Sequence, residues 1–252
     1  MTGKAFTYFC LLCCGYISAQ EDTVHLQEVP VTDYRSKITS ENFSQVKIDS
    51  ATRQHFVGTS MAHLLLEQNT FIVKVYGPGN IASLSVRGST AQQTAVVWNG
   101  VNINNPMLGQ SDVSLVPIGF FDDISLQKGA LSGYWGSGAM AGVLNLRSGT
   151  QNKGLSIKAG SAYSTLQNFT QWASADLSFG KWTSSTKIRA DLSANKYLFY
   201  EDADSLIVET QSHAQSRQYA FMQELALKIS ERQQVGLHIW LQIGSRGRVG
   251  PE

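Results

Sequence analysis

The chain is short of cysteine, and the positions of its few cysteines remove whole classes of chemistry. Its three thiols belong to Cys10, Cys13 and Cys14, inside a segment with the character of a removable leader. The mature chain would then contain no cysteine. Disulfides, thiol catalysis and cysteine-based zinc sites are therefore excluded.

Metal-binding spacings and a charge imbalance are missing as well. None of the histidines has the H-x-x-x-H or H-E-x-x-H spacing of a local metal site: His25, His55, His63, His213 and His238. The chain has 20 Lys and Arg against 19 Asp and Glu, scattered along its length, so it offers no basic face. We expect no metal, no cofactor and no nucleic-acid partner.

Long apolar runs are confined to the N-terminus, where residues 1–19 fit a secretory signal peptide. Lys4 precedes an apolar stretch from Ala5 to Ile17, and small residues lead to cleavage after Ala19. A lipoprotein signal with Cys14 as the acylated residue is the alternative. Beyond this segment no run approaches the roughly 18 residues of a spanning helix. Only strands closed into a barrel could then cross a bilayer.

Residues 46–148 have the pattern of a compact α/β domain of roughly 100 residues. Phe71 to Tyr76 predicts a short strand rich in β-branched residues. Ala95 to Trp98 and Val101 to Ile103 flank Asn99-Gly100. This arrangement predicts a hairpin with a two-residue turn of positive φ.

One segment of this domain imitates a catalytic site. Gly58 to Ala62 matches the surroundings of the nucleophilic serine in subtilisin-like proteases, but the His-Gly and Asp-Ser-Gly or Asp-Thr-Gly partner motifs are missing. Thr59 or Ser60 is better explained as the cap of a helix with an apolar face, formed by Met61, Leu64 and Leu65. Asp122-Asp123 predicts a solvated turn. We expect no enzyme.

Three glycines near the end of the domain imitate a phosphate-binding loop only loosely. Gly136, Gly138 and Gly142 have the spacing G-x-G-x-x-x-G, and only Lys158 stands where an acidic ribose ligand would fall. We expect these glycines to supply positive φ and close backbone approach instead.

Residues 149–252 change to alternation with a period of two. From Lys181 to Asn195 one face is apolar, as at Ile188, and the other carries Lys187 and Arg189. The same period recurs around residues 155–163, 169–179, 218–230 and 235–243.

Alternation of this kind suits either a soluble antiparallel sandwich or a membrane barrel. The segments exceed the roughly 5 to 6 residues of a soluble strand and meet the 9 to 11 that a membrane strand needs. Aromatic residues stand near strand ends, where interfacial girdles belong: Trp182, Tyr197, Phe199 and Tyr200. Length and aromatic placement favour the barrel.

The stretch from Ser85 to Leu146 resembles the plug domain of TonB-dependent outer-membrane receptors. Asn99 replaces the aspartate of the family's Asp-Gly-Val while keeping its turn chemistry, Lys128-Gly129-Ala130 replaces the usual Gly-Pro, and Ala141 replaces a glycine. The resemblance implies an α+β plug domain followed by antiparallel transmembrane strands, an incomplete barrel of the 22-strand type. Its landmarks are Arg87, Gly88, Asn99, Gly100, Gly136, Gly138 and Gly142.

Residues 20–45 are polar, and we expect them to form an exposed, mobile segment. The same resemblance implies a function for part of this segment. Within it, Leu26 to Thr32 looks like the TonB box, which the family hands to periplasmic TonB as an added strand. Pro30 lacks an N–H, so such a strand could pair through only one edge there. The expected TonB-binding residues are Glu28, Val29, Pro30, Val31 and Thr32.

By position, the family's ligand-binding apical loops fall at residues 89–93 and 104–110. Both loops lack Lys and Arg, so they suit a neutral or amide-bearing ligand better than an anion. The expected contacts are Ser89, Thr90, Gln92, Gln93, Asn104, Asn105, Met107 and Leu108.

The resemblance implies uptake of a scarce nutrient, a cobalamin-like or ferric-siderophore ligand, across the bacterial outer membrane. TonB, energised through ExbB and ExbD, would pull on the box and move the plug, while membrane lipid would surround the strands. Roughly five strands of about 22 are present, so we expect an N-terminal fragment. The alternatives are a secreted plug-like binding protein and a non-functional truncated product.

Overall fold

The computed structural model describes residues 44–68, 72–76, 80–149, 154–164, 167–195, 198–200, 208–210, 214–230 and 233–247. The expected signal peptide, the TonB box and residues 20–43 lie outside these ranges, as does Tyr197. Phe199 and Tyr200 are described only as backbone.

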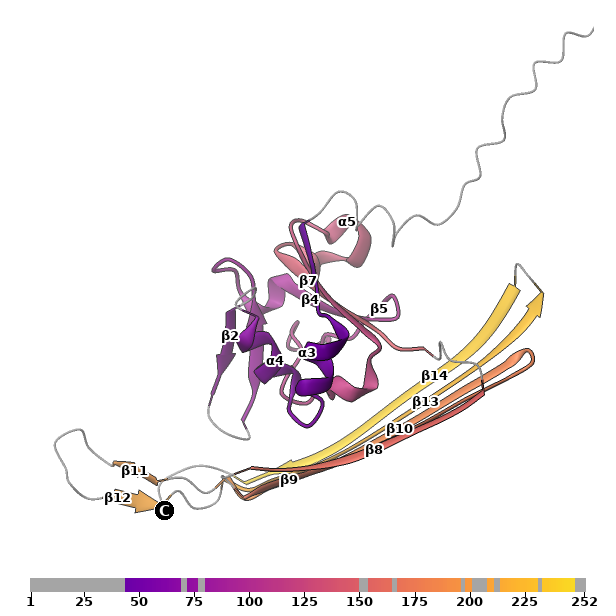
Figure 1. Cartoon of the computed structure of the whole chain (residues 1–252). Helices are drawn as coiled ribbons and strands as arrows, with labels where there is room; N and C mark the ends of the chain where they lie inside the picture. The colour runs from indigo at the N-terminus through magenta and orange to yellow at the C-terminus, as the bar shows by residue number, and fades with distance from the viewer. Residues whose placement is uncertain are drawn as a thin grey trace, which may run out of the picture. The chain divides into compact units, whose positions relative to one another are not determined.

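Residues 44–149 form an α/β domain around a mixed sheet with strand order β1-β6-β7-β4-β5 (Figure 1). β4 and β7 run parallel, and the other neighbouring strands run antiparallel. The parallel pair requires a crossover between its members, and β6 and a short helix lie in that connection. The strands are β1 (Ser44–Lys47), β4 (Thr94–Trp98), β5 (Val101–Asn102), β6 (Asp123–Lys128) and β7 (Gly142–Arg147).

Short helices and a separate hairpin complete the domain. The hairpin pairs β2 (Ile72–Val75) with β3 (Ala82–Ser85), which confirms the strand expected there. The α-helices are α3 (Ser50–His55), α4 (Met61–Glu67) and α5 (Ser132–Trp135). The 3-10 turns are η1 (Ala91–Gln93), η2 (Ile118–Phe120) and η3 (Ser137–Ala139).

The domain has one main apolar core, which the apolar face of α4 enters together with residues of the sheet. Burying such side chains is the dominant favourable term in folding. The largest side chains with almost no exposure include Met61, Leu64, Leu65, Phe121, Ile124, Leu126 and Leu144.

The starts of the two longer helices differ. Asp49 caps α3, because its carboxylate accepts hydrogen bonds from the backbone N–H groups of Ala51 and Thr52, each at 2.9 Å. Ser60 occupies the N-cap position of α4 as expected, yet its side chain makes no capping hydrogen bond. The Thr59 hydroxyl instead donates to the Phe56 carbonyl oxygen at 2.9 Å. The position of the helix was predicted correctly, but side-chain capping by Thr59 or Ser60 was wrong.

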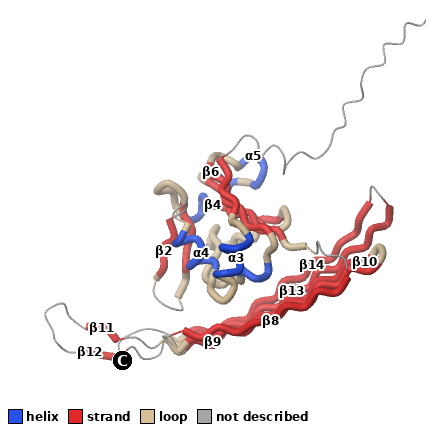
Figure 2. Tube along the Cα trace, viewed as in Figure 1, coloured by secondary structure: helices blue, strands red, loops and turns tan. Residues whose placement is uncertain are grey.

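The second half of the chain is one antiparallel sheet of long strands with order β14-β13-β10-β9-β8, shown in red in Figure 2. All five expected strands form, with lengths of 11 to 15 residues. A small separate ribbon pairs β11 (Leu198–Tyr200) with β12 (Val208–Thr210). The long strands are β8 (Gly154–Ser164), β9 (Asn168–Phe179), β10 (Trp182–Ser193), β13 (Ser216–Ser230) and β14 (Gln233–Arg246).

The two faces of this sheet are buried in reverse of the usual soluble pattern. In β10 the charged side chains of Lys187 and Arg189 are buried, whereas Ile188 between them is 50% exposed. In β13, Glu224 is buried and its neighbour Leu225 is exposed. The buried polar side chains contact the α/β domain through the hydrogen bonds described below, so the apolar face is the outer one.

Candidate functional site

The hairpin at Asn99-Gly100 forms as predicted. Asn99 has φ of 45° and Gly100 has φ of 90°, the left-handed pair that a two-residue turn requires. Arg87 and Gly88 also have positive φ, at 50° and 80°. These four landmarks therefore mark turns of the α/β domain. Gly136 also has positive φ, at 86°, as expected, but the expectation was wrong for Gly138, which lies in η3, and for Gly142, which lies in β7.

The two loops expected to contact ligand meet at one place in the domain, together with the landmark Gly138. A Cβ built on Gly109 would lie 3.1 Å from Cγ of Gln92, so the loops at residues 89–93 and 104–110 adjoin. A Cβ built on Gly138 would lie 3.6 Å from Nδ2 of Asn104 and 3.6 Å from the Gln92 carbonyl oxygen. We name this meeting point of residues 89–93, 104–110 and 138 the loop cluster.

Several loop side chains expected to contact ligand instead form hydrogen bonds within the α/β domain. Thr90 and Gln93 form a capping box around η1, each side chain bonded to the backbone of the other. The Ser89 hydroxyl accepts from the Val86 N–H at 3.1 Å and donates to the Thr90 carbonyl oxygen at 3.4 Å. These side chains shape the turn between β3 and β4.

Asn104 is the central connector of the loop cluster. Its Oδ1 accepts hydrogen bonds from the Val96 N–H and the Ser111 hydroxyl, both at 3.0 Å. Its Nδ2 donates to the Thr94 and Gly109 carbonyl oxygens, both at 3.0 Å. Two donor and two acceptor positions are thereby used, which exhausts the usual capacity of an amide.

The residues next to Asn104 have side chains that are exposed or only partly hydrogen-bonded. Asn105 Oδ1 accepts from the backbone N–H groups of Met107 and Leu108, at 2.9 and 3.2 Å, which leaves its Nδ2 without a described partner. Met107 is 94% exposed and Leu108 is 57% exposed. The Gln92 side chain is exposed as well. The loop cluster therefore presents two amides and two apolar side chains.

A cavity of about 340 Å³ adjoins the loop cluster. Asn105, Leu108 and Gln110 line it from the loop, while Trp240 and Gln242 line it from β14. Gln242 also ties the sheet to the domain, because its Nε2 donates to the Leu115 carbonyl oxygen at 2.5 Å. Residues of β14 and of the loop thus line the same cavity.

Lys187 joins the buried face of the sheet to the α/β domain. Its Nζ donates to the Phe120 carbonyl oxygen at 2.8 Å and to Asp122 Oδ2 at 3.2 Å. Asp122 also accepts from the Gly149 N–H, and Asp123 lies within β6 and pairs with Lys47 at 2.9 Å. The expected solvated turn is therefore confirmed for Asp122, which is an exposed bend residue, and was wrong for Asp123, which begins β6.

A second interface contact links Arg246 of β14 to the loop before η2. Its Nη2 donates to Asp112 Oδ2 at 2.9 Å and to the Ser114 hydroxyl at 3.0 Å. The other oxygen of Asp112 accepts from the Ala82 N–H, so this carboxylate also holds β3 in place.

The third contact is a hydrogen-bond network around the buried carboxylate of Glu224 on β13. Glu224 Oε1 accepts from the Ser148 hydroxyl at 2.6 Å and from Asn99 Nδ2 at 3.1 Å. Nδ1 of His238 on β14 lies 2.8 Å from the same oxygen. The Trp98 indole N–H donates to the Ser148 hydroxyl. The network therefore joins the hairpin turn, the residue after β7 and the long-stranded sheet.

This network explains a departure from the family pattern. An aspartate at position 99 would place a second carboxylate beside Glu224, and two adjacent carboxylates repel each other. The amide of Asn99 donates a hydrogen bond instead. Sequence reasoning recognised Asn99 as a turn residue but missed this role, because its partner is 125 residues away.

Among the described residues, no group of three or more His, Cys, Asp and Glu side chains is placed to hold a metal ion.

None of the helices in the described part of the chain is long and apolar enough to cross a membrane.

A family model described as the TonB-dependent receptor plug domain matches residues 35–143. Curated relatives include the vitamin B12 transporter BtuB of Vibrio cholerae, 33% identical over 86 residues, which are 33% of this chain and 14% of that protein. BtuB of Vibrio vulnificus is 26% identical over 140 residues, covering 52% of this chain and 23% of the relative. The chain thus matches under a quarter of the length of these relatives.

Solved structures with the same fold include the copper transporter OprC, with a TM-score of 0.64 and 17% identity over 79% of this chain and 31% of OprC. The pyoverdine outer membrane receptor FpvA of Pseudomonas aeruginosa has a TM-score of 0.62 at 12% identity, covering 79% of this chain and 27% of FpvA. Both alignments extend past the α/β domain into the long strands, whose architecture matches the receptor barrels. Residues 35–143 therefore match the plug domain of the TonB-dependent receptors, a family of the outer membrane, and the relatives and structural neighbours support a partial receptor in which this domain is followed by five long antiparallel strands.

Proposed function

We propose that the protein acts in TonB-dependent uptake of a scarce nutrient across the outer membrane. The observation that carries this proposal is the burial of Lys187, Arg189 and Glu224 against the plug domain, with apolar side chains on the opposite face. Such a sheet has the polar interior and apolar exterior of a transmembrane barrel wall. The plug is held to that wall by these polar contacts and by apolar ones, since Met222 of β13 is buried in the core of the plug domain and Trp240 of β14 packs against Trp98 and Phe121.

TonB is the proposed source of force, acting on the box from Glu28 to Thr32. Strand addition would draw affinity from backbone hydrogen bonds, and Pro30 restricts pairing to one edge. ExbB and ExbD are the proposed energising partners of TonB.

A cobalamin or a ferric siderophore is the proposed ligand. Vitamin B12 transport is the named activity of BtuB, and pyoverdine is the named ligand of FpvA. Gln92, Asn105, Met107 and Leu108 are the proposed contacts because their side chains remain available at the loop cluster. Ser89, Thr90, Gln93 and Asn104 are proposed to position that surface.

Growth of a strain lacking the gene tests uptake and ligand together. The strain receives either the complete natural gene or the same gene with Val31→Pro in the box, and it is grown with cobalamin or ferric siderophore as the limiting nutrient. We expect the natural gene to restore growth on one nutrient and Val31→Pro to abolish that restoration, because proline removes a strand N–H. Val31→Ala is the matched control and should restore growth. Equal restoration by all three genes would refute TonB-driven uptake.

A further inference from the structure

The order of the two residues in the Asn99-Gly100 turn gives this turn a reactivity of its own. Asn99 is the one asparagine of the chain that precedes a glycine. The backbone nitrogen that follows an asparagine can attack the side-chain amide carbon, and glycine has no Cβ to hinder that approach. The turn is therefore a candidate for deamidation, a covalent change that adds a negative charge.

The attacking nitrogen is free in the structure. Among the described residues, the Gly100 N–H donates no hydrogen bond. A Cβ built on Gly100 would have no heavy atom within 4 Å, and both Asn99 and Gly100 are exposed. Water, the second reactant, can therefore reach the turn.

The side-chain amide of Asn99, in contrast, is held on both sides. Its Oδ1 accepts from the Ser148 N–H at 3.0 Å, and its Nδ2 donates to the Ser148 hydroxyl at 2.9 Å and to Glu224 Oε1 at 3.1 Å. Approach of the amide carbon to the Gly100 nitrogen turns the amide away from these partners. Because hydrogen bonds must break first, the contact with Ser148 and Glu224 slows the reaction.

Part of this restraint comes from the long-stranded sheet. Glu224 belongs to β13, and its Oε1 also accepts from the Ser148 hydroxyl at 2.6 Å, which orients that hydroxyl toward the sheet. The other oxygen, Oε2, is buried and has no partner in the part of the chain that the structure describes. A single carboxylate oxygen of the sheet thus secures the reactive turn of the plug domain.

We propose that Asn99 is a deamidation site that its contact with Glu224 protects, and that the reaction loosens the plug domain from the sheet. The Gly100 nitrogen bonds to Cγ of Asn99, the Cγ–Nδ2 bond breaks, and ammonia leaves with the Gly100 amide proton. Water then opens the resulting succinimide ring at either carbonyl. The products are aspartate and isoaspartate, and the only co-reactant is water.

Both products place a carboxylate where the contact needs a donor. The hydrogen bond from Nδ2 of Asn99 to Glu224 is lost, and two adjacent carboxylates repel each other. Isoaspartate also lengthens the main chain of the two-residue turn by the former side-chain carbon. This inference goes beyond the uptake proposed above and does not depend on which nutrient is carried.

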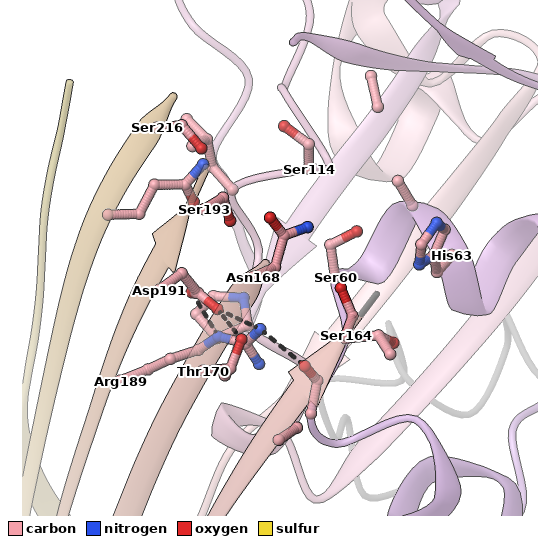
Figure 3. Close-up of a pocket in the computed structure, with 18 of the residues that line it drawn as sticks. Ser60, His63, Ser114, Ser164, Asn168, Thr170, Arg189, Asp191, Ser193 and Ser216 are labelled. Atoms are coloured by element: carbon pink, nitrogen blue, oxygen red, sulfur yellow. Dashed lines mark hydrogen bonds and ion pairs between the residues drawn. The ribbon is translucent and has the colours of Figure 1, made fainter. Parts of the chain in front are cut away.

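The attachment made by Arg189 contains no such reactive pair and serves as an internal reference (Figure 3). Its Nη1 donates to the Val57 carbonyl oxygen of the plug domain at 2.9 Å. Its Nε and Nη2 donate to the two carboxylate oxygens of Asp191 at 2.7 and 2.8 Å. This attachment should persist after Asn99 has reacted.

Prolonged incubation of the detergent-solubilised chain at neutral pH tests the protection, with mass spectrometry of the peptide that contains Asn99 as the measurement. Ser148→Ala and Glu224→Ala should each accelerate conversion by about five- to tenfold, the value of one hydrogen bond. Ser185→Ala is the matched control and should convert at the natural rate, because its buried hydroxyl bonds Asp176 instead. A synthetic peptide of residues 94–104 gives the unrestrained rate, and circular dichroism verifies that each variant is folded. A natural chain that converts as fast as the peptide, or equal rates in Ser148→Ala and Ser185→Ala, would overturn the proposed protection.

The loosening is measured on the converted chain, which ion exchange separates from the unreacted chain by its added charge. Amide hydrogen exchange should accelerate in β5 and around Ser148 but not around Val57. Unchanged exchange in β5 and around Ser148, or equal acceleration around Val57, would overturn the proposed local loosening.

Discussion

The plug domain and the long-stranded sheet bury opposite kinds of side chain. In the plug domain, Met61 and Leu64 are fully buried, as in a water-soluble protein. In the sheet, Lys187 and Glu224 are buried, while Phe221 and Leu237 are exposed. The outer face of the sheet is therefore apolar and exposed, whereas its inner face is mainly polar and adds only a few apolar side chains, such as Met222, to the core of the plug domain.

The largest expected difference between the regions is the cost of removing a leucine. Leu64→Ala should lower the free energy of unfolding of the plug domain by about 2–5 kcal/mol, because it leaves a cavity in a closed core. Leu237→Ala, on the outer face of β14, is the matched control and should cost under about 1.5 kcal/mol in detergent, since no packed cavity forms. Denaturant titration of both variants measures the difference. Equal costs would show that the outer face is packed against protein.

A charged substitution distinguishes the solvents that the two exposed surfaces face. Leu225→Arg, on the outer face of β13, should destabilise the chain in lipid vesicles by about 2–4 kcal/mol if it lies near the bilayer midplane. Leu66→Arg in the plug domain replaces a leucine of similar exposure, 42% against 37%. It should change stability by less than about 0.5 kcal/mol, as surface substitutions do. If Leu225→Arg were equally mild in vesicles, the outer face would not contact lipid.

Replacing the side-chain nitrogen of Asn99 with oxygen should disrupt one contact between the two regions. Asn99→Asp retains a residue suited to the turn but places a carboxylate 3.1 Å from Glu224 Oε1. We expect a loss of about 1–3 kcal/mol in stability, because a buried hydrogen bond becomes a repulsion. Thermal unfolding of the single variant and of Asn99→Asp with Glu224→Gln measures the coupling. Failure of Glu224→Gln to restore stability would contradict the assigned network.

The smallest expected effect concerns the start of α3, in the plug domain alone. The Thr52 hydroxyl and then its backbone N–H hydrogen-bond the carboxylate of Asp49 and hold its pKa below the ordinary value of 3.8. A lowered pKa contributes stability above the unfolded value, and this contribution is lost as pH falls through the folded value. The protection factors of the α3 amides, which compare measured with intrinsic exchange rates, should therefore fall on acidification below pH 3.8. Asp49→Asn, which keeps a capping group but does not titrate, should remove that pH dependence.

Local patterns in the sequence predicted the elements of both regions well. The period of two in residues 154–246 predicted all five long strands, and Asn99-Gly100 predicted its hairpin. These features depend on residues that are close in the sequence, so they can be predicted from one sequence alone. The architecture of the plug domain was predicted from its landmarks by resemblance.

The contacts between the regions could not be predicted, since they join residues far apart in the chain. Lys187 was placed on a charged face, but nothing in the sequence paired it with Phe120 and Asp122. Asn104 was expected to contact ligand because it falls, by resemblance, in an apical loop of the family, yet its amide holds the loop together. The use of an amide by ligand or by scaffold depends on three-dimensional neighbours, which local pattern does not reveal.

Disulfide cross-linking tests most directly whether the plug domain packs on the polar face of the sheet. Gly58→Cys with Ala162→Cys places two sulfur-bearing residues whose Cβ positions are 2.9 Å apart, so a small shift reaches the usual 3.5–4.5 Å of a disulfide. The control pairs Gly58→Cys with Ser161→Cys, the adjacent β8 residue on the opposite face. We predict an intramolecular cross-link, identified by mass spectrometry of the joined peptides, only in the first pair. Equal cross-linking of both pairs, or none in the first, would contradict the packing of the plug domain on this face.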